Sequence, residues 1–168
     1  MKDKKSLIIY FSRADENYFG GEMRYVDKGN TEVIAEYIKD LTGADMFKVE
    51  PLNPYPRNYL ECIEEAKVRT RKHNAPIKEN IPDISEYEVI YIGSPIYWGG
   101  MPEELFTALK ELNFTGKIIR PFVTHEGSGL SGVPRQLKEI CVDAEVTSGL
   151  AIVGSGVNNS KQKVEDWI

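Results

Sequence analysis

Short apolar runs alternate with amphipathic segments along the chain, and this alternation is the feature that most restricts the fold. Most of the runs lack polar alternation, which is typical of strands buried on both faces. The segments between them carry apolar residues at helical spacing. Strands are expected at residues 7–11, 45–51, 88–94, 117–124 and 150–153, and helices at 30–41, 58–72, 101–112, 134–141 and from a cap at Ser160 onward.

Strict alternation of five strands and about five helices predicts an α/β fold with a doubly wound parallel sheet. The simplest strand order is 2-1-3-4-5, with helices on both faces. The strand at 45–51 is expected at an edge, and the helix at 58–72 should be mostly exposed because its apolar positions are sparse. Neither a repeat nor a linker divides the sequence, so residues 1–168 are expected to form a single domain.

Composition restricts the partners and the compartment. Lys and Arg number 21 against 26 Asp and Glu, and the net charge of -5 gives no basic surface for nucleic acid or an anionic membrane. Cys62 and Cys141 lack Cys-x-x-Cys spacing, which favours two reduced thiols over a disulfide or a zinc site. The apolar stretch at 7–11 is too short for a signal-peptide core, so we expect a cytoplasmic protein.

Two neighbouring aromatic residues follow the strand at 88–94. This loop contains Pro95, Ile96, Tyr97, Trp98 and Gly99. Open α/β sheets bind ligands at the carboxyl ends of their strands, so the aromatics favour a flat ligand such as a flavin. Packing of Tyr97 and Trp98 against the next helix is the alternative.

The loop after the first strand predicts a phosphate site. It begins with Ser12 and Arg13, and Gly29, Asn30 and Thr31 then open a helix. Free backbone amides at a helix start bind anions, and hydroxyls and a guanidinium add hydrogen bonds. The alternative is that Asn30 or Thr31 simply caps the helix.

A glycine-rich loop follows the strand at 117–124. Its candidate residues are Thr124, His125, Glu126, Gly127, Ser128 and Gly129. The exposed backbone groups of such a loop suit the polar edge of a heterocycle, although a flexible turn is the alternative. No His, Cys or Asp cluster has metal-ligand spacing, so no metal site is expected.

The three loops together resemble the flavodoxin family over essentially the full length of the chain. The family's phosphate motif, Ser/Thr-x-Ser/Thr-Gly-x-Thr, is matched by Ser12, Gly29, Asn30 and Thr31, and residues 94–98 and 124–129 resemble its two flavin loops. The resemblance implies FMN held non-covalently at the carboxyl edge of the sheet. It further implies a small electron carrier that exchanges electrons with a redox partner protein or a small-molecule acceptor.

Two other functions stay open at this point. The chain is alternatively an NAD(P)H-dependent FMN reductase acting on quinone-type acceptors, or a flavin-binding interaction module without redox activity. The sequence shows no nucleophile and base pair of the kind that hydrolases and transferases use, which favours electron transfer.

The phosphate motif is interrupted by a long insertion at residues 13–28, which is the departure from the family pattern. Long loops in compact domains usually carry function. The insertion contains Tyr18, Phe19 and Tyr25, so we expect it to fold over the flavin or against a second subunit in a homo-oligomer. Packing on its own aromatics is the alternative. The insertion also puts the reach of Ser12 and Arg13 toward a phosphate in question.

Overall fold

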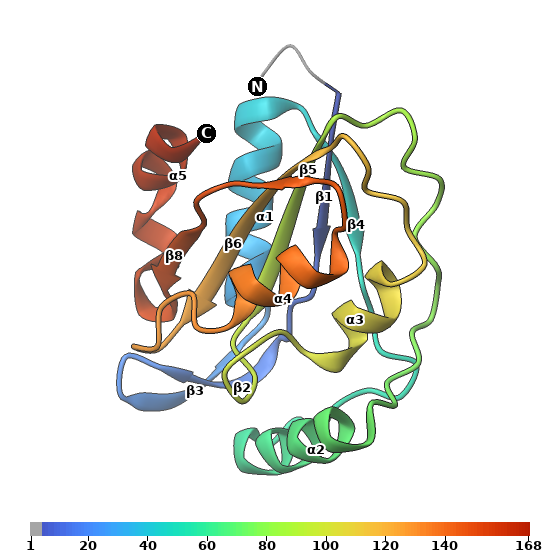
Figure 1. Ribbon diagram of the computed structural model, residues 1–168. Helices are drawn as coiled ribbons and strands as arrows, with labels where there is room; N and C mark the ends of the chain where they lie inside the picture. The colour runs from blue at the N-terminus through green and yellow to red at the C-terminus, as the bar shows by residue number, and fades with distance from the viewer. Residues whose placement is uncertain (1–4) are drawn as a thin grey trace.

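A parallel sheet forms the centre of the computed structural model, which describes residues 5–168. Its strands run in the order β4-β1-β5-β6-β7, with β8 also paired to β6 (Figure 1). The predicted order 2-1-3-4-5 is therefore confirmed. The strands are β1 (Ser6–Tyr10), β4 (Asp45–Lys48), β5 (Val89–Pro95), β6 (Ile118–His125), β7 (Glu145–Val146) and β8 (Leu150–Val153).

The central strands are buried on both faces, as their continuous apolar sequences predict. All of β1 is buried, and β5 is buried from Val89 to Ser94. Side chains on both faces of these strands enter an apolar layer, which fits their continuous apolar character. Among the described residues, β4 pairs only with β1, and it is partly exposed, as expected of an edge strand.

The outer position beside β6 is divided between two short strands. β7 pairs with Ile118 and Ile119, and β8 pairs with the segment from Phe122 to His125. This differs from the single strand expected at 150–153. The polar sequence Thr147-Ser148-Gly149 interrupts the apolar pattern between the two strands, so the sheet has six strands in five positions.

Four helices cover the two faces of the sheet. α1 (Asn30–Thr42) and α5 (Lys161–Trp167) share an apolar cluster with Ile8 and Tyr91 on one face. α3 (Glu103–Leu109) and α4 (Val133–Ile140) share a cluster with Ile9 and Ile92 on the other. Within residues 5–168, no helix has the length and apolar character needed to cross a bilayer.

The start of α5 differs from expectation in one detail. Ser160 occupies the N-cap position, but its hydroxyl donates to the Val157 carbonyl (2.7 Å) and accepts nothing from the helix. The preceding residues form the 3-10 turn η1 (Gly154–Asn159), whose last turn uses that hydroxyl. Local turn bonding therefore replaces the predicted cap.

The fifth helix, α2 (Tyr59–Lys72), lies beyond the carboxyl ends of the strands (Figure 1). It packs against α3 and against the segment inserted after β1. Leu60 and Val68 are exposed, whereas Cys62, Ala66 and Arg69 are buried. The sparse apolar positions do not suffice to cover a sheet face, so α2 instead becomes a wall at the sheet's edge.

The insertion folds as a β-hairpin of β2 (Asp15–Phe19) and β3 (Glu22–Val26). Gly20 and Gly21 form its two-residue turn with φ of 63° and 92°. Such turns require positive φ at both positions, and a Gly-Gly pair between alternating side chains is a hairpin signal. The hairpin extends beyond the carboxyl edge of the sheet, on the same side as α2 (Figure 1).

Candidate functional site

A cavity of about 410 Å³ lies at the carboxyl edge of the sheet. This volume is in the range of small-molecule and cofactor sites. The three loops named above meet in it, together with the start of α1, one face of α2 and the hairpin. Its lining residues are Ser12, Arg13, Asn17, Tyr18, Asn30, Thr31, Tyr59, Cys62, Ile63, Ala66, Pro95, Ile96, Tyr97, Trp98, Thr124, His125, Glu126 and Ser128.

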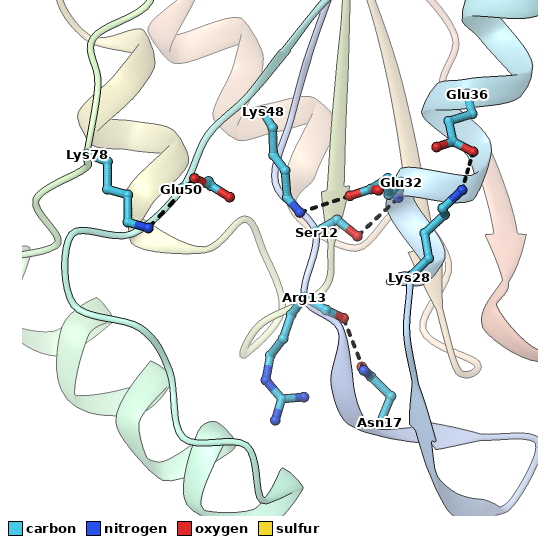
Figure 2. A network of polar contacts seen from close by, with 9 residues as sticks. All are labelled: Ser12, Arg13, Asn17, Lys28, Glu32, Glu36, Lys48, Glu50 and Lys78. Atoms are coloured by element: carbon cyan, nitrogen blue, oxygen red, sulfur yellow. Dashed lines mark hydrogen bonds and ion pairs between the residues drawn. The ribbon is translucent and has the colours of Figure 1, made fainter.

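The start of α1 presents an anion-binding arrangement to this cavity. The Ser12 hydroxyl accepts a hydrogen bond from the Glu32 amide (3.1 Å) (Figure 2). The Val33 amide donates to the Gly29 carbonyl (3.3 Å). The two earlier amides, of Asn30 and Thr31, have no acceptor among residues 5–168. Free amides at the positive end of a helix favour a bound anion.

Gly29 does not line the cavity, but it lets the Ser12–Arg13 loop pack closely against the start of α1. A Cβ there would lie 2.2 Å from the Ser12 hydroxyl oxygen and 2.6 Å from the Arg13 carbonyl oxygen. Only glycine lets the first loop approach the helix start this closely. At the other side, Thr31 and Thr124 share a hydrogen bond of 2.8 Å between their hydroxyls, which ties the first loop's helix to β6.

Arg13 has partners other than the predicted phosphate. Its terminal nitrogens donate to the carbonyls of Glu16, Pro56 (2.8 Å) and Arg57 (2.7 Å). Figure 2 shows the side chain extending away from Ser12 and the start of α1. The insertion places Arg13 at the base of the hairpin, so its guanidinium joins the hairpin to the segment before α2. The Arg13 guanidinium is therefore engaged by backbone carbonyls although the residue lines the cavity, and its contact with a bound phosphate stays a prediction.

Two ion pairs lie beside the helix start. Lys48 bonds Glu32 (2.9 Å), and Lys28 bonds Glu36 one turn further along α1 (2.7 Å) (Figure 2). Glu32 belongs to the first turn of α1, where its charge would oppose a bound anion. The Lys48 ammonium offsets that charge at short range.

The loop after β5 makes a tight turn, which gives Tyr97 and Trp98 different surroundings. Tyr97 and Gly100 exchange backbone hydrogen bonds of 2.8 and 3.2 Å, with φ of 50° at Trp98 and 82° at Gly99. A positive φ at a tryptophan is uncommon, and strained backbone clusters at functional sites. Gly99 does not line the cavity, and its carbonyl accepts the Gly132 amide (2.9 Å).

Tyr97 and Trp98 therefore have separate roles. The Tyr97 ring packs edge-on against Phe11 and Tyr55 with centroids 5.7 Å apart in each pair. Trp98 is 54% exposed, and its indole nitrogen donates to the Ile63 carbonyl (2.7 Å). Tyr97 is fixed by the core, whereas Trp98 spans from the loop to α2 at the cavity's rim.

The loop after β6 completes the cavity with Thr124, His125, Glu126 and Ser128. Burial, with a smaller effect of Lys163, lowers the pKa of His125, and its Nδ1 accepts the Gly127 amide (2.9 Å). Burial raises the pKa of Glu126, and the Gly20 amide at the hairpin tip partly offsets this rise. The hairpin thus reaches the third loop.

Gly127 and Gly129 were predicted to contact the ligand, but neither lines the cavity. Their φ values of 136° and 65° shape the turn that presents Ser128 between them. Of the six residues predicted in this loop, Thr124, His125, Glu126 and Ser128 line the cavity, and the contact of any of them with a ligand stays a prediction. Within residues 5–168, no group of three His, Cys, Asp or Glu side chains is arranged to hold a metal ion.

Six lining residues were not among the predicted site residues, although Tyr18 belongs to the insertion that was expected to fold over the flavin or against a second subunit. Tyr59, Cys62, Ile63 and Ala66 occupy positions i, i+3, i+4 and i+7 of α2, which is one helix face. Asn17 and Tyr18 come from the hairpin, and the Tyr18 ring lies 6.2 Å from the Tyr59 ring. The helical spacing was readable, but the position of α2 beyond the sheet was not.

An open parallel sheet in this strand order, with a cavity at its carboxyl edge and helices on both faces, defines a doubly wound α/β class of protein. Within that class, the chain belongs to the flavodoxin family, because the family model described as Flavodoxin matches residues 23–168. That match begins inside β3, so β1 and β2 lie before it. No curated protein is similar enough in sequence to count as a match.

Solved structures share this fold at low sequence identity. A protein from Bacteroides eggerthii DSM 20697, provisionally described as a flavoprotein, is 23% identical with a TM-score of 0.72, covering 97% of this chain and 99% of its own. A flavoprotein from Lactobacillus acidophilus NCFM in complex with FMN is 21% identical with a TM-score of 0.64, covering 93% and 97%. A variant of the Fusobacterium nucleatum flavodoxin bound to flavin mononucleotide is 17% identical with a TM-score of 0.56, covering 98% and 93%.

Proposed function

We propose that the cavity at the carboxyl edge binds FMN non-covalently and that the protein transfers electrons through it. The observation that carries this proposal is the presence, on one cavity, of a helix start with two free amides and a loop with two aromatic side chains. An anion site next to a flat apolar surface fits a flavin phosphate and ring in one molecule. Similar folds that hold FMN support the same ligand.

At the phosphate end, the amides of Asn30 and Thr31 and the hydroxyl groups of Ser12 and Thr31 would hold the anion. Charge-assisted hydrogen bonds of this type are about twice as strong as neutral ones. Ser12 already accepts from Glu32, so its hydroxyl hydrogen remains available to donate.

At the ring end, Tyr97 and Trp98 would contact the isoalloxazine, and the loop from Thr124 to Ser128 would meet its polar edge. The flavin supplies the redox chemistry when bound, and the protein sets its orientation and its exposure to water. Apolar lining and limited solvation disfavour added negative charge on a bound ring.

Titration of the apoprotein with FMN and with riboflavin tests this proposal. We expect one FMN per chain and binding at least about tenfold weaker for riboflavin, because riboflavin lacks the phosphate that the start of α1 would hold. Bound FMN should show absorbance bands near ~375 and ~450 nm. Equal affinity for the two flavins would contradict the proposed site.

A second candidate function is reduction of small acceptors, such as quinones, with electrons from NAD(P)H. The observation that favours it is the hairpin, whose Asn17 and Tyr18 line the same cavity and whose tip reaches Glu126. A wall of this kind restricts which molecules reach a bound flavin. An open electron carrier has less use for such a wall.

Steady-state oxidation of NAD(P)H by the FMN-loaded protein, with a quinone as acceptor, separates the two candidates. Turnover supports the reductase, whereas reduction only by a separate flavin reductase or redox partner supports the carrier. A protein that binds FMN but accepts electrons from neither is an interaction module. Replacing residues 14–27 by a short Gly-Ser connection should change the rate with quinones more than FMN affinity if the hairpin selects the acceptor.

A further inference from the structure

A fully buried carboxylate lies behind the aromatic part of the cavity. Glu104, in the first turn of α3, is 0% exposed. Its two oxygens accept hydrogen bonds from the Tyr55 hydroxyl (2.8 Å) and from a terminal nitrogen of Arg69 (2.8 Å). A buried charge requires such compensation, because transfer from water costs several kcal/mol without it.

Arg69 connects this carboxylate to α2. Its Nε donates to Glu65 (3.0 Å), and its guanidinium carbon lies 3.9 Å from the Tyr55 ring centroid. The Arg69 side chain is itself only 10% exposed. The ion pair between Arg69 and Glu104 therefore joins α2 to α3, although α2 lies beyond the sheet.

Tyr55 connects the same carboxylate to the cavity. Its ring packs edge-on against Phe11 (6.0 Å) and Tyr97 (5.7 Å), and Phe11 and Tyr97 pack edge-on against each other. Tyr97 lines the cavity, and its hydroxyl lies 3.9 Å from the Cys62 sulfur, which lines it as well. Glu104, Tyr55 and Arg69 do not line the cavity themselves, but Glu104 holds Tyr55, whose ring packs against the cavity-lining Tyr97.

Stability alone does not account for this arrangement. Replacing a buried ion pair by apolar residues of similar volume is often neutral or stabilising, whereas removing one partner is costly. The distinctive consequence here is geometric, because the ion pair fixes α2, which covers no sheet face, and Glu104 also holds Tyr55, whose ring packs against the cavity-lining Tyr97. Edge-on aromatic packing has a preferred geometry, so it transmits the position of Tyr55 to Tyr97.

We propose that Tyr55, Arg69 and Glu104 are positioning residues, which hold the Tyr97 ring and the α2 wall in the arrangement that receives the flavin. The receiving role rests on the proposed function, whereas the coupling between the buried triad and the cavity does not. The experiment therefore needs one readout with FMN and one without it.

Tyr55→Phe tests the proposal, because it keeps the ring and removes the bond to Glu104. Tyr87→Phe is the matched control, since it also removes a tyrosine-carboxylate bond, from the Tyr87 hydroxyl to Asp45 (2.6 Å), at a site remote from the cavity. The readout without FMN is the labelling rate of the Cys62 thiol by iodoacetamide. Cys141, also free and buried, reports global opening in the same sample.

We expect Tyr55→Phe to accelerate Cys62 labelling about fivefold relative to Cys141 and to weaken FMN binding about threefold to tenfold, with a changed flavin absorption spectrum. Tyr87→Phe should change each quantity by less than about twofold. Equal acceleration of both thiols, or no change in either, overturns the coupling. Normal coupling in a protein that fails to bind FMN contradicts only the proposed function.

A triple variant, Tyr55→Phe with Arg69→Met and Glu104→Met, guards against loss of folding. An apolar triad should restore stability but not the position of Tyr97, so Cys62 labelling should remain fast and the flavin spectrum altered. If this variant shows wild-type labelling and a wild-type flavin spectrum, the triad is only core filling and the proposal is wrong.

Discussion

The two ends of the cavity are built in different ways. The end at the start of α1, which we propose holds the phosphate, uses backbone amides and a hydroxyl from the preceding loop, with the Glu32 amide bonded to Ser12. The α2 and hairpin end uses side chains that bond across separate elements, such as Arg13 to the Arg57 carbonyl and Trp98 to the Ile63 carbonyl. One end therefore depends on the geometry of a single helix terminus, and the other depends on how several elements are docked together.

The difference predicts different consequences of substitution. A change at the helix start should act on the binding of charge and so distinguish FMN from riboflavin. A change at the α2 and hairpin end should act on the cavity's shape and so affect both flavins alike. The predictions below test that division, beginning with the largest effect.

Gly29→Ala should have the largest effect on FMN binding. A Cβ at this position would lie 2.6 Å from the Arg13 carbonyl and 2.2 Å from the Ser12 hydroxyl, so the first loop must move away from α1. We expect a loss of roughly 2–3 kcal/mol in FMN binding free energy and a smaller loss for riboflavin, measured by fluorescence titration.

Gly43→Ala, at the other end of α1, is the matched control. Gly43 has φ of 73°, and a Cβ there would meet nothing within 4 Å. This substitution should cost about 1 kcal/mol of unfolding free energy through backbone strain while leaving FMN binding nearly unchanged. Similar loss of FMN affinity in both variants would mean that α1 stability, and not the helix start, controls binding.

Trp98→Ala should be next in size and should not distinguish the two flavins. It removes an aromatic wall and the bond from the indole to Ile63, so we expect FMN and riboflavin binding each to weaken by about 1–2 kcal/mol. Trp167→Ala is the control, because the Trp167 ring packs against Tyr91 and Arg120 and does not line the cavity. It should lower stability and leave flavin affinity unchanged; the reverse ranking in titrations would remove Trp98 from the site.

Sequence reasoning reached the central strands and the helix start because both have local signals, and the sheet order followed from the general topology of doubly wound folds. Continuous apolar runs identify buried strands, and Gly29 followed by Asn30 and Thr31 identifies a helix start. The hairpin also had a local signal, Gly20-Gly21, but residues 13–28 were interpreted as a long loop that interrupts the phosphate motif.

The rest depended on contacts between residues far apart in sequence. The bonds of Arg13 to Pro56 and Arg57 follow from where the hairpin docks, which no local pattern encodes. The same holds for Glu104, a charged residue that is fully buried. Its burial is possible only because Arg69 and Tyr55 converge on it in the folded chain.

Lys48→Met should have a smaller effect on FMN binding, and it tests the role of charge at the start of α1. Without the Lys48 ammonium, the Glu32 carboxylate beside the helix start is uncompensated and opposes a phosphate. We expect FMN binding to weaken by about 0.5 kcal/mol at low salt, with the effect fading toward ~1 M salt and no change for riboflavin. Lys28→Met, which frees Glu36 one turn away, should have less effect. A loss for both flavins that salt does not reduce would contradict an electrostatic role for Lys48.

The smallest predicted effect concerns Glu126, where the hairpin tip meets the third loop. Burial raises its folded pKa above the ordinary value of 4.5, so the native state binds this proton more tightly than the unfolded state does. Stability should therefore fall as pH rises from about 4.5 through the folded pKa, and Glu126→Gln should remove that fall. Urea unfolding should then show Glu126→Gln gaining stability over the wild type between about pH 4 and about pH 7. Glu126 is exposed, so the gain should be small. A loss in place of a gain would show that the Gly20 amide outweighs burial, and that the hairpin is held closed over the cavity by the charged form of Glu126.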